Sequence, residues 1–233
     1  MTSAEKKNAI CSVKLCCTMT ASNGCSLDTL QSMIIEENTK NATADITDVL
    51  VFPGGDTECL LETSAPFSFQ VFPGSSSKLL LSFQGGGLCF NEMTTVEFTM
   101  CTPDAIPSRT EGVYDTLDSR NPYQDYTIVN SLYCSGDFFI GNLSVTYDSD
   151  DRKDVQVTQS GVTNVESVIS WIESQQNGGH IKSEVDDLVV LGYSAGGVAA
   201  QMWSPVLVNQ FKHQTAAVIS DSFMGIVPPG ENK

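Results

Sequence analysis

The chain has 233 residues and a formal net charge of −16 at pH 7, with a pI of about 4.2. Nucleic acids and anionic membranes would repel so acidic a surface, and we expect neither as a partner. The length is enough for one domain with a sizeable core. No apolar stretch is long enough to span a bilayer, and the polar start does not resemble a signal peptide.

Cysteine usage points to an oxidising compartment. Eight cysteines are many for a cytosolic enzyme, and none has the C-x-x-C spacing of a zinc or thioredoxin-like site. We therefore expect disulfides, a secretory route, and no metal or organic cofactor. Glycosylation sequons at Asn41 and Asn142 add weak support. The lack of a signal peptide conflicts with this route, and a true start upstream of Met1 or a wrongly assigned N-terminus would resolve the conflict.

Residues 1–48 are rich in Ser, Thr, Asn and Cys, and only 28–37 has the spacing of an amphipathic helix. We interpret 1–48 as a poorly ordered leader and 49–233 as the folded domain. The first strands of that domain are predicted at Val49–Phe52 and Phe67–Phe72. Because each is bounded by Pro-Gly, they are expected to form an antiparallel hairpin at a sheet edge.

The next part of the chain alternates strands and helices. Apolar runs at Lys78–Phe83, Tyr126–Tyr133 and Leu188–Leu191 are typical of strands buried on both faces. Gly161–Glu173 carries a helical apolar stripe, and Ala216–Ser220 is a further short strand. The alternation predicts an α/β fold, with a mostly parallel sheet flanked by helices.

The string G-Y-S-A-G-G at residues 192–197 directly follows a predicted strand. This context is typical of the nucleophile elbow of α/β-hydrolases, in which a strained turn presents a serine, here Ser194. A helix that begins near Ala195 would direct its free N–H groups at an oxyanion beside that serine. Pro205 is expected to kink or interrupt this helix. A glycine-rich turn without catalytic function is the alternative.

Three glycines, 85–87, close the strand that ends at Phe83. Their bare backbone N–H groups can turn toward a ligand, and in α/β-hydrolases the corresponding loop supplies oxyanion donors. A glycine triplet also occurs simply as a flexible turn.

Five segments of the chain occur together in a recognisable order: Gln84–Asn91, Asn121-Pro122-Tyr123, Tyr133-Cys134-Ser135-Gly136-Asp137 with Gly141, Gly192–Gly197, and Ser220-Asp221-Ser222. In these segments the chain resembles the pectin acetylesterase and Notum family of carboxylesterases. The resemblance covers about residues 50–230 and implies that Ser194 is the nucleophile and that the N–H groups of Gly86, Gly87 and Ala195 form the oxyanion hole.

The resemblance also implies two disulfides, Cys59–Cys134 and Cys89–Cys101. It leaves four cysteines unassigned, namely Cys11, Cys16, Cys17 and Cys25. The chain departs from the family at Leu88, where pectin acetylesterases usually have tryptophan, and at Phe138-Phe139, where plant members have small polar residues. Because of these departures, the resemblance does not assign the residues of the acyl-group pocket, but it still assigns the nucleophile.

A serine nucleophile needs a histidine base, and this chain has two histidines. His180 and His213 precede predicted parallel strands, so we expect them at the opposite sheet end from Ser194, roughly 15 to 20 Å away, whereas proton transfer requires ~3 Å. The resemblance places the triad Asp and His in a C-terminal segment without a counterpart here. The resemblance implies that Asp221 has a structural role. The alternative is that Asp221 is the triad acid.

The sequence therefore predicts a serine carboxylic-ester hydrolase of the pectin acetylesterase type that deacetylates polysaccharide or another ester substrate. We expect it to be a monomer that lacks the C-terminal strands of the fold and is weakly active or inactive. One alternative is a non-catalytic protein that binds a glycan or acyl chain in the same pocket. Another is an inactive gene fragment.

Overall fold

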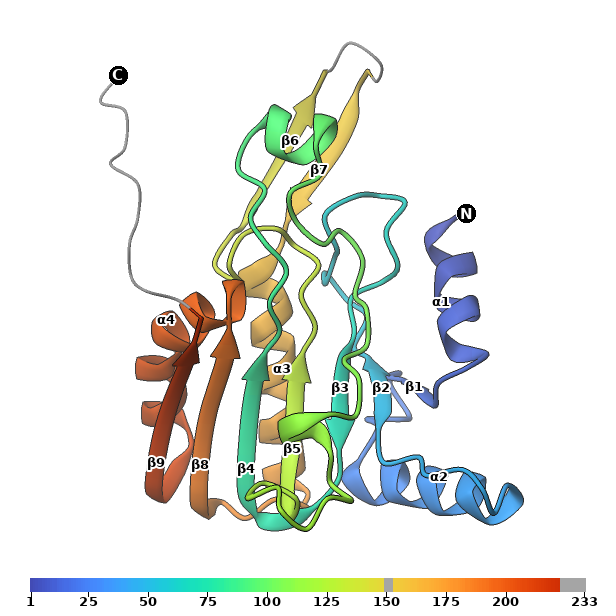
Figure 1. Ribbon diagram of the computed structural model, residues 1–233, viewed down its shortest axis with the longest axis vertical. Coiled ribbons are helices and arrows are strands. Elements are labelled where there is room, and N and C mark those ends of the chain that lie inside the picture. Colours follow the sequence, from blue (N-terminus) through green and yellow to red (C-terminus); the bar gives the residue numbers. More distant parts are fainter. Residues whose placement is uncertain (149–152, 223–233) are drawn as a thin grey trace.

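A seven-stranded sheet organises residues 1–148 and 153–222, the part of the chain that this computed structural model describes (Figure 1). Its strands are β1 (Cys16–Thr18), β2 (Val49–Phe52), β3 (Phe69–Phe72), β4 (Ser75–Phe83), β5 (Tyr126–Ser131), β8 (Glu184–Tyr193) and β9 (Lys212–Asp221). Their order across the sheet is β1-β2-β3-β5-β4-β8-β9. Strands β5, β4, β8 and β9 run parallel, while β3 is antiparallel to both of its neighbours.

The parallel strands β4, β5 and β8 are buried on both faces over their apolar runs, which explains their continuous apolar sequence, whereas β9 is largely exposed. In β4, Leu79 and Leu81 pack into the main core, and Leu80 packs into a second cluster with Tyr114 and Ile128. The predicted apolar runs all fall on observed strands, and the prediction of a mostly parallel sheet in an α/β fold is confirmed.

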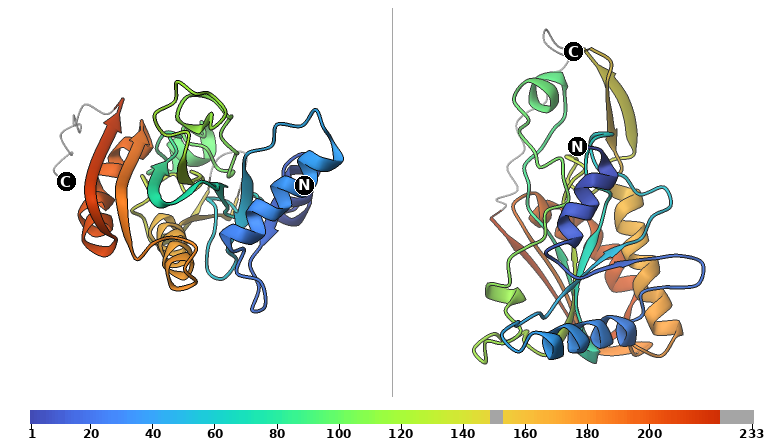
Figure 2. Two further views of the ribbon diagram at one scale, coloured as in Figure 1. Left: turned by 90° about the horizontal axis from the view of Figure 1, so that it is seen from below. Right: turned by 90° about the vertical axis from the view of Figure 1, so that its right-hand side faces the viewer.

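The two faces of the sheet are covered differently. Helices α3 (Gly161–Asn177) and α4 (Ala195–Gln210) lie on the same face (Figure 2, left). The connections β5 to β8 and β8 to β9 step in one direction across the sheet, so right-handed crossovers put both helices on that side. The connection from β4 to β5 steps back. It covers the other face with the 3₁₀ turn Gly112–Tyr114, whose Tyr114 packs on Leu80 and Val189.

Two local expectations need correction. The β2–β3 pair is antiparallel as predicted, but β1 pairs in parallel with β2 on its outer side, so the hairpin is not the sheet edge. Helix α4 continues through Pro205 to Gln210, so the expected interruption is absent, while the alternative of a kink stays a prediction. A second sheet, the hairpin of β6 (Leu143–Tyr147) and β7 (Val155–Gln159), was not predicted and projects beyond the carboxyl ends of the parallel strands (Figure 1).

The N-terminal segment is ordered, contrary to the expectation of a poorly ordered leader. It forms α1 (Ser3–Cys11), β1 and α2 (Leu27–Lys40). The four cysteines that the resemblance leaves unassigned form two bridges, Cys11–Cys16 and Cys17–Cys25. These short disulfide loops stabilise a segment that has little apolar periodicity, which is why the sequence pattern did not indicate its order.

This segment shares the main core. Leu30 of α2 is completely buried there. Two buried hydrogen bonds join the segment to α3: the Trp171 indole N–H donates to the Cys25 carbonyl (3.1 Å), and the Leu27 N–H donates to Gln175 Oε1 (2.9 Å). Among the described residues, no helix combines the length and the apolarity needed to cross a membrane.

Replacement of Leu30 by alanine tests whether the N-terminal segment belongs to the core. Because the side chain is fully buried, Leu30→Ala should lower the free energy of unfolding by about 2 to 5 kcal/mol. Ile35 of the same helix is 66% exposed, so Ile35→Ala is the matched control and should change it by less than about 0.5 kcal/mol. Urea unfolding followed by circular dichroism measures both variants. A loss of stability in Leu30→Ala as small as that in Ile35→Ala would show that α2 is not packed on the core.

Candidate active site

Ser194 lies at the junction of β8 and α4, in a strained backbone conformation. Its φ is 54° and its ψ is −120°, a combination that costs a non-glycine residue about 1 to 3 kcal/mol. The residue is exposed, whereas the next one, Ala195, is buried. The Ser194 N–H donates to the carbonyl of Asp221 at the end of β9 (3.0 Å). The turn therefore presents a serine at the carboxyl edge of the sheet.

Two glycines permit this turn. A Cβ atom at Gly192 would overlap the carbonyl oxygen of Gly196, and a Cβ atom at Gly196 would overlap the carbonyl oxygen of Phe83 at the end of β4. Both positions therefore require glycine, as sequence reasoning predicts. The contact at Gly196 brings the first turn of α4 directly against the backbone of β4.

The glycine loop after β4 lies beside Ser194. A Cβ atom at Gly85 would come within 2.8 Å of both the ring and the carbonyl oxygen of Tyr193, the residue before the serine. At Gly86 a Cβ atom would overlap the ring of Tyr133, and Gly87 has a φ of +78°. The three residues that the resemblance assigns to the oxyanion hole thus come from two backbone segments that meet next to Ser194.

Side chains at the base of the glycine loop hold it in place. The Gln84 amide oxygen accepts the Tyr133 N–H (3.0 Å), and its Nε2 donates to the Ile106 carbonyl (2.9 Å). The Gly86 carbonyl accepts the Thr102 N–H (2.8 Å). The loop is therefore tied to the end of β5 and to the segment that follows Cys101.

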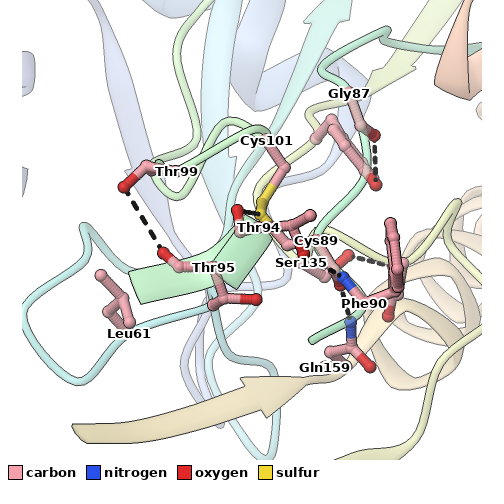
Figure 3. The surroundings of a disulfide bond; sticks show 12 residues. Leu61, Gly87, Cys89, Phe90, Thr94, Thr95, Thr99, Cys101, Ser135 and Gln159 are labelled. Carbon is pink, nitrogen blue, oxygen red and sulfur yellow. Dashed lines mark hydrogen bonds between the residues drawn. A yellow bond between two sulfur atoms is a disulfide. The ribbon is translucent and has the colours of Figure 1, made fainter. Parts of the chain in front are cut away.

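Disulfides brace the same region. The structure contains the pairs Cys59–Cys134 and Cys89–Cys101 that the resemblance implies. Around the second bridge, the side-chain Nε2 of Gln159, at the end of β7, donates to the Cys89 carbonyl (2.6 Å) (Figure 3). The segment that this bridge closes exposes large apolar side chains: Phe90, Met93, Phe98 and Met100.

Both histidines lie at the opposite end of the sheet, as expected. His213 pairs with Val185 on β8, eight residues before Tyr193, which corresponds to about 26 Å along the strand. Its Nδ1 lies 2.8 Å from the Phe211 carbonyl oxygen. His180 precedes the start of β8 and has its Nδ1 3.2 Å from the Asp28 carboxylate. Neither imidazole can reach the Ser194 hydroxyl.

Asp221 adjoins the elbow through its backbone. It pairs with Tyr193 at the end of β9, and its carbonyl accepts the Ser194 N–H. Its exposed carboxylate accepts the Ser222 hydroxyl (3.2 Å). Through its backbone carbonyl, Asp221 therefore holds the turn at Ser194 in place.

Sequence reasoning quoted Asp137 as part of a motif but gave it no function. Its buried carboxylate accepts four hydrogen bonds, from the Ser135 hydroxyl (2.6 Å) and from the N–H groups of Phe139 (2.9 Å), Gly141 (3.1 Å) and Gly161 (2.8 Å). A Cβ atom at Gly141 or Gly161 would overlap this carboxylate. The sequence signal for this arrangement is Asp137 followed four residues later by Gly141, because a glycine leaves space for the carboxylate to approach the backbone N–H.

The described residues contain no group of three or more His, Cys, Asp or Glu side chains arranged to hold a metal ion. All eight cysteines are in disulfides.

No protein-family model matches the chain, and no curated protein matches its sequence. Among solved structures, it is similar to the Wnt deacylase Notum from Drosophila. In crystal form II, the TM-score is 0.50 and the identity 18%, over 72% of this chain and 50% of that one. Crystal form I gives 0.45 and 18%, over 68% and 46%. The chain thus spans about half the length of the protein it matches, and the likeness establishes an α/β-hydrolase-like fold.

Replacement of Gly196 by alanine tests the contact on which the turn depends. The added methyl group would meet the Phe83 carbonyl, so Gly196→Ala should lower the free energy of unfolding by about 1 to 3 kcal/mol. Gly24 has no heavy atom within 4 Å of the same added carbon, so Gly24→Ala is the control and should stay within about 0.5 kcal/mol of the parent. Denaturant unfolding measures both variants, and a neutral Gly196→Ala would contradict the close approach.

Proposed function

We propose that this chain carries the nucleophile and the oxyanion hole of a serine carboxylic-ester hydrolase of the pectin acetylesterase and Notum type. The observation that supports this most directly is the strained, exposed Ser194 at the carboxyl edge of a parallel sheet, beside a glycine loop. A serine in an ordinary turn has no need of a left-handed φ or of two glycines that avoid backbone overlap.

In the proposed reaction, Ser194 Oγ attacks the carbonyl carbon of an ester while a base removes its proton. The N–H groups of Gly86, Gly87 and Ala195 stabilise the oxyanion that forms. Ala195 is the first residue of α4, so its N–H has no intrahelical partner and remains available. The alcohol then leaves with a proton, and water releases the acyl group as a carboxylic acid, which regenerates the serine. No step needs a cofactor.

The base in this proposal is neither His180 nor His213, because both lie at the far end of the sheet. The base of the triad is therefore a group other than these two histidines. Without a base in place, Ser194 should react slowly, helped only by the oxyanion donors and the α4 terminus.

The proposed substrates are esters of polysaccharides or other acylated molecules. The structural neighbour is described as a Wnt deacylase, which supports removal of an acyl group as the reaction class. The charge of −16 counts against unmodified pectin, itself a polyanion. Four disulfides support a secretory location, where such substrates occur. We propose that the protein acts as a monomer.

The remote position of both histidines also favours a second candidate, a protein that binds a glycan or acyl chain at the same site without hydrolysing it. The fold and the oxyanion loop would then be retained for binding alone.

Reaction with a fluorophosphonate probe tests the nucleophile. We expect slow labelling of Ser194, accelerated by free imidazole because the small base can substitute for the missing side chain. Mass spectrometry of the labelled peptide identifies the residue, and Ser194→Ala, which removes one exposed hydroxyl, should abolish labelling without a change in the circular dichroism spectrum.

Folded protein that is never labelled, with or without imidazole, would contradict the hydrolase proposal. Acyl or glycan binding by that same unlabelled protein would favour the binding protein. Equal labelling of the parent and Ser194→Ala would show that another residue reacts.

A further inference from the structure

The chain around Cys101 pairs with the glycine loop as in an antiparallel sheet. Gly87 and Cys101 form an antiparallel bridge, and the Thr102 N–H donates to the Gly86 carbonyl (2.8 Å). A Cβ atom at Gly87 would overlap the carbonyl oxygen of Met100, so the two backbones are in direct contact. One side of the glycine loop is therefore occupied by backbone from this segment.

The bond from Thr102 fixes the direction of one oxyanion donor. In a trans peptide unit, the carbonyl and the N–H lie in one plane and point in opposite directions. The Gly86 carbonyl and the Gly87 N–H belong to the same unit, so a carbonyl held toward Thr102 turns the Gly87 N–H to the other side of the loop. Within the part of the chain that the structure describes, this N–H has no acceptor. It is therefore available for a ligand.

Glycine cannot hold this orientation by itself. Without a Cβ atom, a glycine adopts a positive or a negative φ with similar ease, and Gly87 has a φ of +78°. The peptide unit between Gly86 and Gly87 would therefore rotate easily if its carbonyl were not held. The bond from Thr102 restrains that rotation and gives the Gly87 N–H one defined direction.

A disulfide holds Thr102 in place. Cys101, the residue before it, is bridged to Cys89, and both cysteines are buried (Figure 3). Cys89 is itself anchored, because its N–H donates to the Gly136 carbonyl (2.8 Å) and its carbonyl accepts the Gln159 side chain. The position of the donor to the glycine loop thus depends on a covalent bond to a fixed point.

We propose that the Thr102 N–H is a positioning group for the oxyanion hole: it keeps the Gly87 N–H turned toward Ser194. It acts through the Gly86 carbonyl and is itself held by the Cys89–Cys101 bridge. This inference rests on the proposed function, in which Gly87 is an oxyanion donor. Thr102 makes no contact with the substrate, so its effect on the reaction passes entirely through the glycine loop.

Thr102→Pro removes the proposed donor, because proline has no backbone N–H. Thr102→Ala is the conservative comparison, since it loses the same side chain and keeps the N–H. Proline requires an extended residue before it, and Cys101 fulfils this because it pairs in an antiparallel bridge. A difference between the two variants therefore reports the backbone N–H.

The first measurement is the rate at which a fluorophosphonate labels Ser194 in the presence of imidazole. Thr102→Pro should lower the maximal labelling rate about tenfold or more, because the oxyanion loses an aimed donor, whereas Thr102→Ala should stay within about twofold of the parent. The probe concentration that gives half of the maximal rate should change little, since the oxyanion forms only during the reaction.

A purely structural effect of Thr102→Pro would lower the labelled fraction at the end of the reaction and leave the folded molecules reacting at the parent rate. That outcome would overturn the inference. Equal maximal rates in Thr102→Pro and Thr102→Ala would overturn it as well.

The second measurement does not depend on reactivity. The Thr102 amide of the parent should be strongly protected from hydrogen exchange, because it donates to the Gly86 carbonyl. The NMR chemical shift of the Gly87 amide should move in Thr102→Pro, because its peptide unit loses the bond at the carbonyl, and should stay near the parent value in Thr102→Ala. Rapid exchange of Thr102 in the folded parent, or an unmoved Gly87 signal in Thr102→Pro, would contradict the inference. Absence of labelling in the parent would instead count against the hydrolase proposal alone.

Removal of the disulfide tests the same inference if Thr102→Pro does not fold. Cys89→Ala combined with Cys101→Ala should slow the labelling reaction and accelerate exchange of the Thr102 amide roughly tenfold, the factor expected for one lost hydrogen bond. Cys17→Ala combined with Cys25→Ala is the matched control, because that bridge is also buried and joins positions 8 residues apart, against 12. The control should keep both parent values. Equal changes in the two proteins, or no change in the first, would overturn the inference.

Discussion

The contact between two backbones, at the first turn of α4 and the last residue of β4, is the constraint on which the site depends. Because Gly196 has no side chain, the helix can start directly against the Phe83 carbonyl. The serine before that helix consequently lies at the rim of the sheet, next to the loop that leaves β4. Strain at Ser194 is the local cost of this approach, and the buried strands β4 and β8 stabilise it.

The fold and the elbow could be predicted because their signals are local. Strands buried on both faces need unbroken apolar runs, and the elbow needs glycines at 192 and 196 for steric reasons. In the N-terminal segment the sequence indicates only the helix at 28–37, which is α2, and the β6–β7 hairpin was not predicted. The rest of the N-terminal segment is held by short disulfide loops and by long-range bonds to α3. The hairpin strands do alternate apolar and polar residues, and Val145, Tyr147 and Val155 pack with Val157 in a small cluster apart from the main core.

The candidate site shows the same division. The glycine loop is visible in the sequence, but the atoms that orient it come from residues far along the chain. Thr102 and Tyr133 supply those atoms, and only the folded structure shows which carbonyl each one meets. The distance that excludes His213 follows from parallel strand order, a topological property that sequence alternation indicates before any coordinate is known.

The Cys59–Cys134 bridge joins positions 75 residues apart, and the Cys89–Cys101 bridge closes the segment after the glycine loop. Both lie beside the site, whereas the central strands β4, β5 and β8 contain no cysteine and are stabilised by apolar burial. Production in a reducing cytosol would therefore affect the two parts unequally. Such a preparation would retain its secondary structure while the loops around Ser194 lose their covalent restraint, so a normal far-ultraviolet spectrum would not show that the loops around Ser194 are native.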